Sequence, residues 1–168
     1  MRFKISRPGA RYLEAVRARG PEGKLKTVEV RGAILPPEIV AGTRGYIERM
    51  ALEINGSYQS EWYDAAAVMC RRLMESLIIE VYESQKRQAE IKPGGTYLPL
   101  EKLINHIAAD RNVSLGRNTP KSMNHIKELG DTAAHDRTYI TKQPDIDESR
   151  TEIRRVISEL LHLSGVRR

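Results

Sequence analysis

A helical pattern of apolar residues over about positions 57–88 constrains the fold of this chain more than any other feature. One narrow arc of this helix is apolar, and further apolar positions widen the arc on one side. The narrow arc holds Trp62, Ala65, Ala66, Met69, Leu73 and Leu77, and the widening set is Tyr63, Ala67, Met74, Ile78 and Val81. A helix that is apolar over more than half of its circumference must be covered by other elements on several sides. The pattern therefore predicts a long central helix, with Trp62 in the core.

Four further segments carry the periodicity of amphipathic helices and are joined by short connections. They span about residues 37–56, 99–111 and 119–136, followed by a last helix that Asp145 or Asp147 caps and Gly165 closes. Thr119 is expected to cap its helix, with Pro120 in the first turn. Five helices with short connections favour an all-α fold, with the helices packed as a bundle over residues 36–168.

All of the excess positive charge lies in the first fifth of the chain. Residues 1–35 hold nine lysines and arginines against three acids, whereas residues 36–168 hold nineteen of each. A basic side chain that neutralises a phosphate releases counterions, so a basic arm on a neutral body can bind RNA or DNA. The candidate nucleic-acid-binding residues are Arg7, Arg11, Arg17, Arg19, Lys24, Lys26 and Arg31, with Arg137 in the body. The alternative is a solvated extension that binds nothing. Within the arm, the pattern of residues 25–31 is compatible with one short strand or an extended docking segment.

Composition indicates the setting in which this chain works. Its 168 residues, of which 40% are hydrophobic and 30% charged, are typical of one soluble globular domain. The apolar runs are far shorter than the ~20 residues of a membrane helix, and the N-terminus has no apolar signal region. The single cysteine, Cys70, falls in the apolar pattern of the central helix, which predicts a buried thiol. We therefore expect a cytoplasmic protein that does not contact a membrane.

A polar stripe near the C-terminal third is the first candidate site. Lys127, Asp131 and His135 are spaced i, i+4, i+8, which places them on one face of a helix, beside an apolar face that includes Gly130. In a catalytic interpretation His135 is a general acid or base, Asp131 orients it, and Lys127 supplies positive charge. In a structural interpretation His135 caps the helix and anchors the next loop.

The central helix carries a second polar stripe, formed by Arg72, Ser76 and Glu80 at the same spacing. Glu80 shares the azimuth of the apolar arc, where an unpaired charge is costly. Its expected partner is Lys127, His135, another lysine or arginine, or the same surface of a second subunit. The alternative is a carboxylate at the helix end that bonds to water. Arg71 and Glu75 are expected to point away from the core as a surface pair.

The sequence predicts neither a metal site nor a cofactor. The four histidines, His106, His125, His135 and His162, have no second histidine or cysteine at the spacing of a zinc site. The chain also has no glycine-rich phosphate-binding motif and no nucleophile-elbow motif.

Two runs of residues in the body carry a family resemblance. They are Tyr63-Asp-Ala-Ala-Ala-Val-Met-Cys-Arg71-Arg72-Leu-Met-Glu75 and His125-Ile-Lys127-Glu-Leu-Gly130-Asp131-Thr-Ala-Ala-His135. Over residues 36–168 the chain resembles a prokaryotic family of helical domains of unknown function. That family is similar to the HEPN superfamily and often stands beside restriction or phage-defence modules. The resemblance implies an antiparallel helical bundle and a homodimer.

The resemblance also implies what an active site would need. Active HEPN ribonucleases carry an arginine a few residues before a histidine, and two such motifs meet across the dimer to cleave RNA without metal. Here the nearest arginine upstream of His135 is Arg117, with seventeen residues between them. The nearer cation is Lys127, which lacks the bidentate fork of a guanidinium. Arg137 follows the histidine and can substitute if the chain turns back there.

Two functional hypotheses therefore follow from the sequence. The first is a HEPN-like dimerisation module of a prokaryotic defence or regulatory system, which acts without catalysis by binding a partner protein and nucleic acid. The second is a metal-independent ribonuclease that uses His135 as general acid or base in a composite dimer site.

Overall fold

The computed structural model describes residues 32–167, and these residues form six α-helices and two short 3₁₀ turns. The α-helices are α2 (Pro37–Val40), α3 (Gly45–Gln59), α4 (Tyr63–Ser84), α5 (Leu100–Ala109), α6 (Thr119–His135) and α7 (Gln143–Ser164). The 3₁₀ turns are η1 (Gln88–Ile91) and η2 (Pro93–Gly95), which lie between α4 and α5. Because the described residues contain no strand, the prediction of an all-α fold is confirmed. The predicted strand at residues 25–31 lies outside the described part of the chain.

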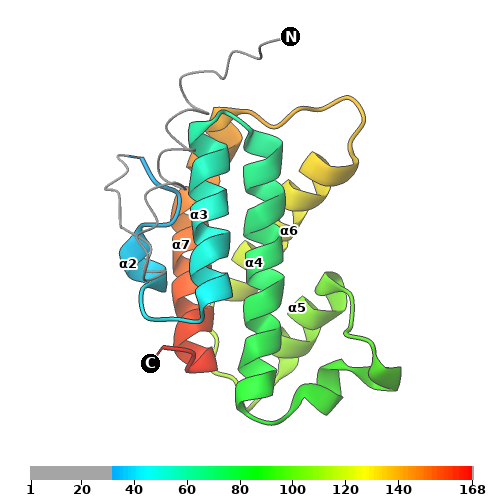
Figure 1. Cartoon of the computed structure of the whole chain (residues 1–168). Helices are drawn as coiled ribbons and strands as arrows, with labels where there is room; N and C mark the ends of the chain where they lie inside the picture. Colours follow the sequence, from blue (N-terminus) through cyan, green and yellow to red (C-terminus); the bar gives the residue numbers. More distant parts are fainter. Residues whose placement is uncertain (1–31, 168) are drawn as a thin grey trace.

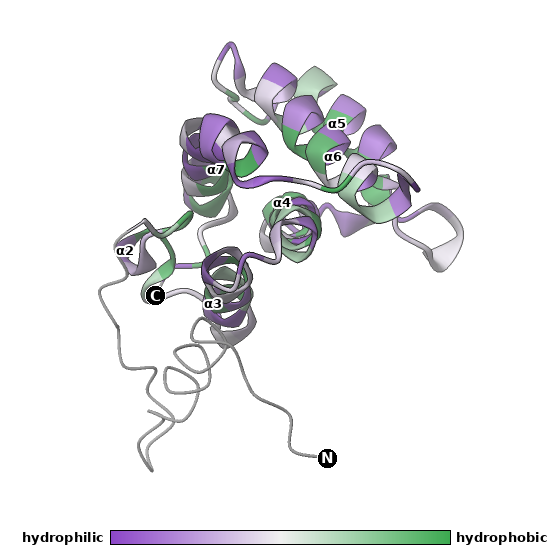
Figure 2. Ribbon diagram, turned by 90° about the horizontal axis from the view of Figure 1, so that it is seen from above, coloured by the Kyte–Doolittle hydropathy of each residue, from purple (hydrophilic) through white to green (hydrophobic). Residues whose placement is uncertain are grey.

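Four long helices run alternately up and down, and α4 is the central one. In Figure 1 α3 runs upward, α4 downward, α6 upward and α7 downward. Seen along the helices in Figure 2, α4 lies between α3, α6 and α7, and the hydrophobic positions face inward. The core side chains of α4 include Leu73, Met74, Leu77 and Ile78, all fully buried. Cys70 is buried as well, as predicted.

The first predicted helix is interrupted. It was expected to span residues 37–56, but the chain leaves the helical conformation after Val40 and resumes it at Gly45. Gly42 lies between the two pieces with φ +74°, a left-handed conformation that glycine adopts without steric cost. The single predicted helix is therefore two helices, α2 and α3.

The placement of Trp62 in the core is wrong. The central helix begins at Tyr63 rather than near Ser57, because the chain reverses after Gln59 through Glu61, whose φ is +62°. Trp62 is the N-cap residue before α4, and 59% of it is exposed. Ala65, in the same predicted arc, is also exposed. The angular position of Trp62 on a helical wheel does not predict its burial, because this residue lies before the helix begins.

The ends of the later helices lie close to the predicted ones. α6 begins at Thr119, but its N-cap residue is Asn118 rather than Thr119. Glu159 of α7 fixes this start by accepting hydrogen bonds from Gly116 N and Thr119 Oγ1, both at 2.5 Å. α7 begins two residues before Asp145, whose side chain accepts a hydrogen bond from Lys142 N. Gly165 closes α7 in the left-handed conformation, as predicted.

Residues 33–35 pack into the helical body, although the sequence pattern placed them with the arm. Ala33, Ile34 and Leu35 are buried. Asn55 of α3 binds the backbone of Leu35 in both directions, at 3.0 Å to its N and 2.7 Å to its O. Arg154 of α7 donates to the carbonyl of Ile34 at 2.8 Å. These contacts fix the point at which the chain enters the described body.

Candidate functional site

Helices α4 and α6 approach each other closely at Gly130. A Cβ atom on Gly130 would lie 2.5 Å from Cβ of Arg71 and 2.8 Å from its Cδ. Real Cβ atoms do not come so close to another side chain. Glycine at position 130 therefore allows the side chain of Arg71 to pack directly against the backbone of α6. The close approach is therefore part of how the first candidate site is built.

The crossing brings four charged side chains together. Nε of Arg71 lies 2.6 Å from Oδ1 of Asp131, and Nζ of Lys127 lies 2.8 Å from Oδ2. Nη1 of Arg71 also lies 3.5 Å from Glu75, one turn along α4. The side chains of Arg71, Lys127 and Asp131 are 21–31% exposed. Both oxygens of Asp131 are thus engaged by cations from two different helices.

Electrostatics match this geometry. Partial burial alone would raise the pKa of Asp131, but the hydrogen bond from Lys127 and the positive charge of Arg71 outweigh it. The pKa of Asp131 is therefore held below its usual value. The hydrogen bond to Asp131 raises the pKa of Lys127, against a smaller opposing effect of burial. Both groups are charged at neutral pH, and each stabilises the charge of the other.

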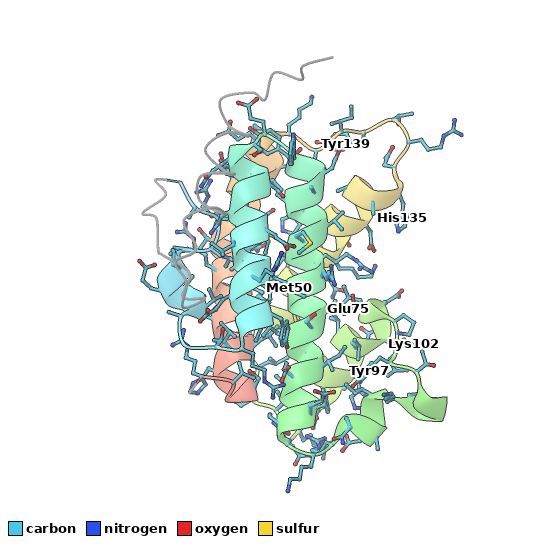
Figure 3. The ribbon with its side chains drawn as sticks, viewed as in Figure 1. Met50, Glu75, Tyr97, Lys102, His135 and Tyr139 are labelled. Carbon is cyan, nitrogen blue, oxygen red and sulfur yellow. The ribbon has the colours of Figure 1, made fainter. Side chains whose placement is uncertain are left out.

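His135 stands apart from this network. It is the last residue of α6 and is exposed, and Figure 3 shows it at the free end of that helix. Asp131 lies one turn before it, but its carboxylate is bound to Arg71 and Lys127. Among the side-chain hydrogen bonds of residues 32–167, none involves the imidazole of His135. The structure brings Lys127 and Asp131 together and leaves His135 beside them without a hydrogen bond to Asp131.

The expectation for Arg71 is wrong in one respect. Arg71 does pair with Glu75, but it does not point away from the neighbouring helices, because its shorter ion pair crosses to Asp131. Sequence spacing shows only the pairs within one helix. The signal that could have indicated the crossing is Gly130, a glycine in the middle of a helix, which often marks a close approach of another element.

The second stripe lies along α4, and its members differ in exposure. Arg72 is exposed, and Ser76 is partly buried and donates to the carbonyl of Arg72 at 3.0 Å. Glu80 is 4% exposed, so it requires a partner. Of the expected partners, neither Lys127 nor His135 contacts it. An arginine elsewhere in the chain does.

Two residues at the start of α3 hold Glu80. Nη1 of Arg44 lies 3.0 Å from Oε1 of Glu80, and the hydroxyl of Tyr46 donates to the same oxygen at 2.5 Å. Burial and then this hydrogen bond raise the pKa of Tyr46 far above its usual value. The other oxygen, Oε2, is buried without a hydrogen-bond partner among the described residues. Sequence reasoning did not identify Arg44 or Tyr46, which lie more than thirty positions before Glu80.

Comparison with known families assigns the segment that carries both stripes. A family model described as a domain of unknown function, DUF4145, matches residues 53–164. The chain belongs to the DUF4145 family. A search of the curated proteins and a search of the solved structures found no significant match.

The DUF4145 segment holds one candidate site completely and the other in part. Arg71, Lys127, Asp131 and His135 all fall inside residues 53–164. Glu80 does too, but its partners Arg44 and Tyr46 come before the segment begins. The pairing of Arg71 with Asp131 is thus internal to the DUF4145 domain.

The predicted nucleic-acid-binding residues divide between two parts of the chain. Arg7, Arg11, Arg17, Arg19, Lys24, Lys26 and Arg31 lie outside the described residues. Arg137 is described and is exposed in the connection between α6 and α7. That connection turns at Asp136, whose Oδ1 accepts hydrogen bonds from Thr138 N at 2.8 Å and Tyr139 N at 2.9 Å.

Sequence reasoning missed a further cluster of charged residues. These residues line a shallow cavity of about 300 Å³ at the C-terminal end of α4. Arg87 lies 2.8 Å from Asp110 and binds both oxygens of Glu90, and His106 lies 3.6 Å from Glu90. The hydroxyl of Tyr82 donates to Asp110 at 3.0 Å. Most of the charged side chains that line this cavity are therefore already paired with one another.

Metal-binding clusters and membrane-spanning helices are both absent from residues 32–167. In this part of the chain no group of three or more histidine, cysteine, aspartate or glutamate side chains is placed to hold a metal ion. No helix in the same residues has the length and apolar character needed to cross a membrane.

Proposed function

We propose that this DUF4145 protein is a HEPN-like helical module that forms a homodimer and binds other macromolecules without catalysing a reaction. It acts in the cytoplasm, within a prokaryotic defence or regulatory system, by binding a partner protein and, through its basic arm, RNA or DNA. The observation that carries this proposal is a strip of the central helix that no other helix of residues 32–167 covers. In Figure 2 the side of α4 between α3 and α6 faces outward.

This uncovered strip mixes exposed and half-buried side chains. Ala65 and Arg72 are exposed, and the apolar side chains of Val68, Met69 and Ile79 are only partly buried. The central helix of a bundle is ordinarily covered on most of its surface. Packing against the same strip of a second copy buries these apolar side chains by a twofold contact, in which one patch meets itself.

The state of Asp131 supports binding rather than catalysis. A general base needs an orienting group, and the carboxylate one turn before His135 is held by Arg71 and Lys127. No hydrogen bond among residues 32–167 therefore fixes the tautomer of His135, as acid–base catalysis by histidine ordinarily requires.

Sedimentation tests the dimer. The wild-type protein should sediment at twice its 19.1 kDa mass. Ala65→Arg places a charged side chain in the uncovered strip and should shift the protein to monomer, because a buried unpaired charge opposes association. Ala108→Arg is the matched control on an exposed position of α5 and should remain dimeric. A monomeric wild type, or an Ala65→Arg protein that dimerises equally well, contradicts the proposal.

Salt dependence tests nucleic-acid binding by the arm. For a binder of double-stranded DNA, log K should fall with log salt by about 0.9 for each phosphate that is neutralised. Reversing two arm charges with Arg17→Glu and Arg19→Glu should weaken binding and reduce that slope. Arg117→Glu, on an exposed residue of the body, is the control. An affinity for nucleic acid that changes neither with salt nor with the arm substitutions would contradict this part of the proposal.

One observation favours a ribonuclease as the second candidate. The guanidinium of Arg71 is bonded to Asp131 one turn before His135, so an arginine stands near the stripe although none precedes the histidine closely in sequence. In this mechanism His135 takes the proton of a ribose 2′-hydroxyl while the 2′-oxygen attacks the adjacent phosphorus, and the 5′-oxygen leaves with a proton from water. Arg71 or Arg137 stabilises the negative charge on the phosphate. The test compares RNA cleavage by the wild type and His135→Ala, with folding checked by circular dichroism. Equal activity in both, or activity in neither, excludes His135 as a catalytic residue.

A further inference from the structure

Exposed apolar side chains gather at one end of the molecule. Five large apolar residues are exposed in the described part of the chain, and Trp62, Tyr139 and Ile140 are three of them. Trp62 is 59% exposed and Ile140 71%. Thr141 N donates to Oδ1 of Asp64 at 2.9 Å, which holds the segment with Tyr139 and Ile140 beside the first turn of α4. Figure 3 shows Tyr139 at this end. We call Trp62, Tyr139 and Ile140 the aromatic end.

The segments around the aromatic end are acidic. Residues 58–64 and 136–150 together contain six acids and three bases. Glu61 and Glu148 are exposed and take part in none of the ion pairs of residues 32–167. An apolar surface with uncompensated negative charge around it fits a partner that is basic and carries apolar groups.

The packing of the aromatic end is less complete than that of the rest of the described body. Four buried side-chain polar atoms of residues 32–167 have no hydrogen-bond partner, and three of them belong to Gln59, Ser60 and Thr141. Gln59 and Ser60 closely precede Trp62, and Thr141 follows Ile140. Each such atom costs about 1–3 kcal/mol, so native proteins seldom leave several of them together. Three of the four therefore lie at this end, which is the least completely hydrogen-bonded part of residues 32–167.

The basic arm enters the body close to this surface. The carbonyl of Gly32 accepts a hydrogen bond from Nη1 of Arg150 at 2.6 Å, and Nη2 of Arg150 donates to the hydroxyl of Tyr58 at 2.9 Å. The ring of Tyr58 packs edge-on against Tyr63, 5.6 Å between centroids, and Tyr63 follows Trp62. At about 3.3 Å per residue, an extended chain of the arm's length reaches any point of this end.

We propose that the aromatic end is the docking surface for the chain's own residues 1–31. These residues contain nine lysines and arginines and three acids, a charge opposite to that of the surface. Arginine and lysine side chains stack on Trp62 and Tyr139 and pair with Glu61 and Glu148, and apolar arm residues cover Ile140. This inference goes beyond the proposed function and depends on neither dimerisation nor nucleic-acid binding.

Trp62 is the reporter for the test, because it is the only tryptophan of the chain. Acrylamide quenching of its fluorescence is measured on the full chain at about 0.1 M and at about 1 M salt. A docked arm shields Trp62 at low salt. Because the Debye length falls from about 10 Å to about 3 Å between these conditions, quenching should rise roughly twofold or more at high salt. The triple variant Lys24→Glu, Lys26→Glu, Arg31→Glu should show the high quenching at both salt concentrations.

Charge reversal on the surface gives an independent second measurement. Glu61→Lys with Glu148→Lys should raise quenching at low salt as the arm variant does. Glu128→Lys, on an exposed position of α6 away from the aromatic end, should leave it unchanged. Quenching that is the same in the wild type and both variants at both salt concentrations overturns the proposal. An equal effect of Glu128→Lys overturns it as well. Shielding that grows with protein concentration also overturns it, since the arm then comes from a second copy.

Discussion

Replacing Gly130 by alanine separates close helix packing from helix propensity, because the two effects have opposite signs at this position. Alanine favours a helix interior over glycine by about 1 kcal/mol, so propensity alone predicts a more stable protein. The added Cβ would lie 2.5 Å from Cβ of Arg71 and 2.8 Å from its Cδ, well inside the roughly 3.5–4.0 Å of an ordinary carbon contact. Cβ of Arg71 is fixed to the backbone of α4 and cannot rotate away.

The two helices must therefore separate, and the balance is destabilising. Overpacking of this kind costs about 1–3 kcal/mol. Weakening the partly exposed pair of Arg71 and Asp131 adds up to about 1 kcal/mol. After subtraction of the propensity gain, Gly130→Ala should lower the free energy of unfolding by about 2 kcal/mol. For a chain of this size that corresponds to a fall of about 4–8 °C in Tm.

Thermal and urea unfolding, followed by circular dichroism, measure this change against a matched control. Gly45→Ala adds the same methyl group at the first residue of α3, where nothing lies within 4 Å of the new Cβ, and it should be neutral or stabilising. In an Arg71→Ala background most of the penalty for Gly130→Ala should remain, because the 2.5 Å contact is to Cβ. A Gly130→Ala protein as stable as the wild type would refute the reasoning.

Two further predictions concern the charged clusters. In the folded state the pKa of Asp131 lies below its ordinary value of 3.8. The Asp131 carboxylate therefore stabilises the fold at pH values above 3.8, and this stabilisation is lost as the pH falls through the folded pKa. Urea unfolding at several pH values should therefore show a shallower loss of stability below pH ~4 for Asp131→Asn than for the wild type, and identical pH profiles would contradict this. Glu80→Ala should lower the free energy of unfolding by about 1–3 kcal/mol, since it removes the hydrogen bond of Tyr46 and the ion pair with the half-exposed Arg44. Glu128→Ala is the exposed control, expected within about 0.5 kcal/mol of wild type, and equal effects of the two substitutions would show that Glu80 is not held as described.

Periodicity was enough to predict the fold class, because burial on one face is a property of each helix alone. The α5, α6 and α7 segments were located to within a few residues on this basis, whereas the central helix begins six residues later than predicted. The break at Gly42 and the reversal at Glu61 were not predicted. Both depend on a positive φ at one residue, and the apolar pattern continues across them. The same limit explains Trp62, which keeps the period of the helix while lying outside it.

Contacts between helices were predicted less well than positions on them. The spacing of Lys127 and Asp131 correctly predicted that they share a face, and the burial of Glu80 followed from its azimuth. Their partners could not be read from the sequence, because an azimuth does not tell which helix lies opposite or at what level. Arg71 and Arg44 were both visible as arginines, but only the packing of α4 against α6 and α3 assigns each to its carboxylate.

The same packing determines how experiments on the polar stripe must be read. Asp131 and Lys127 belong to the contact that joins α6 to α4, so a substitution at either position changes stability together with any activity. His135 is exposed at the end of α6 and its side chain takes part in none of the hydrogen bonds of residues 32–167, so its removal leaves the packing unchanged. A loss of RNA cleavage in His135→Ala with unchanged Tm would therefore be a chemical effect, whereas the same loss in Asp131→Asn would not separate chemistry from folding. His135 is for this reason the residue at which the binding module and the ribonuclease can be distinguished by a single substitution.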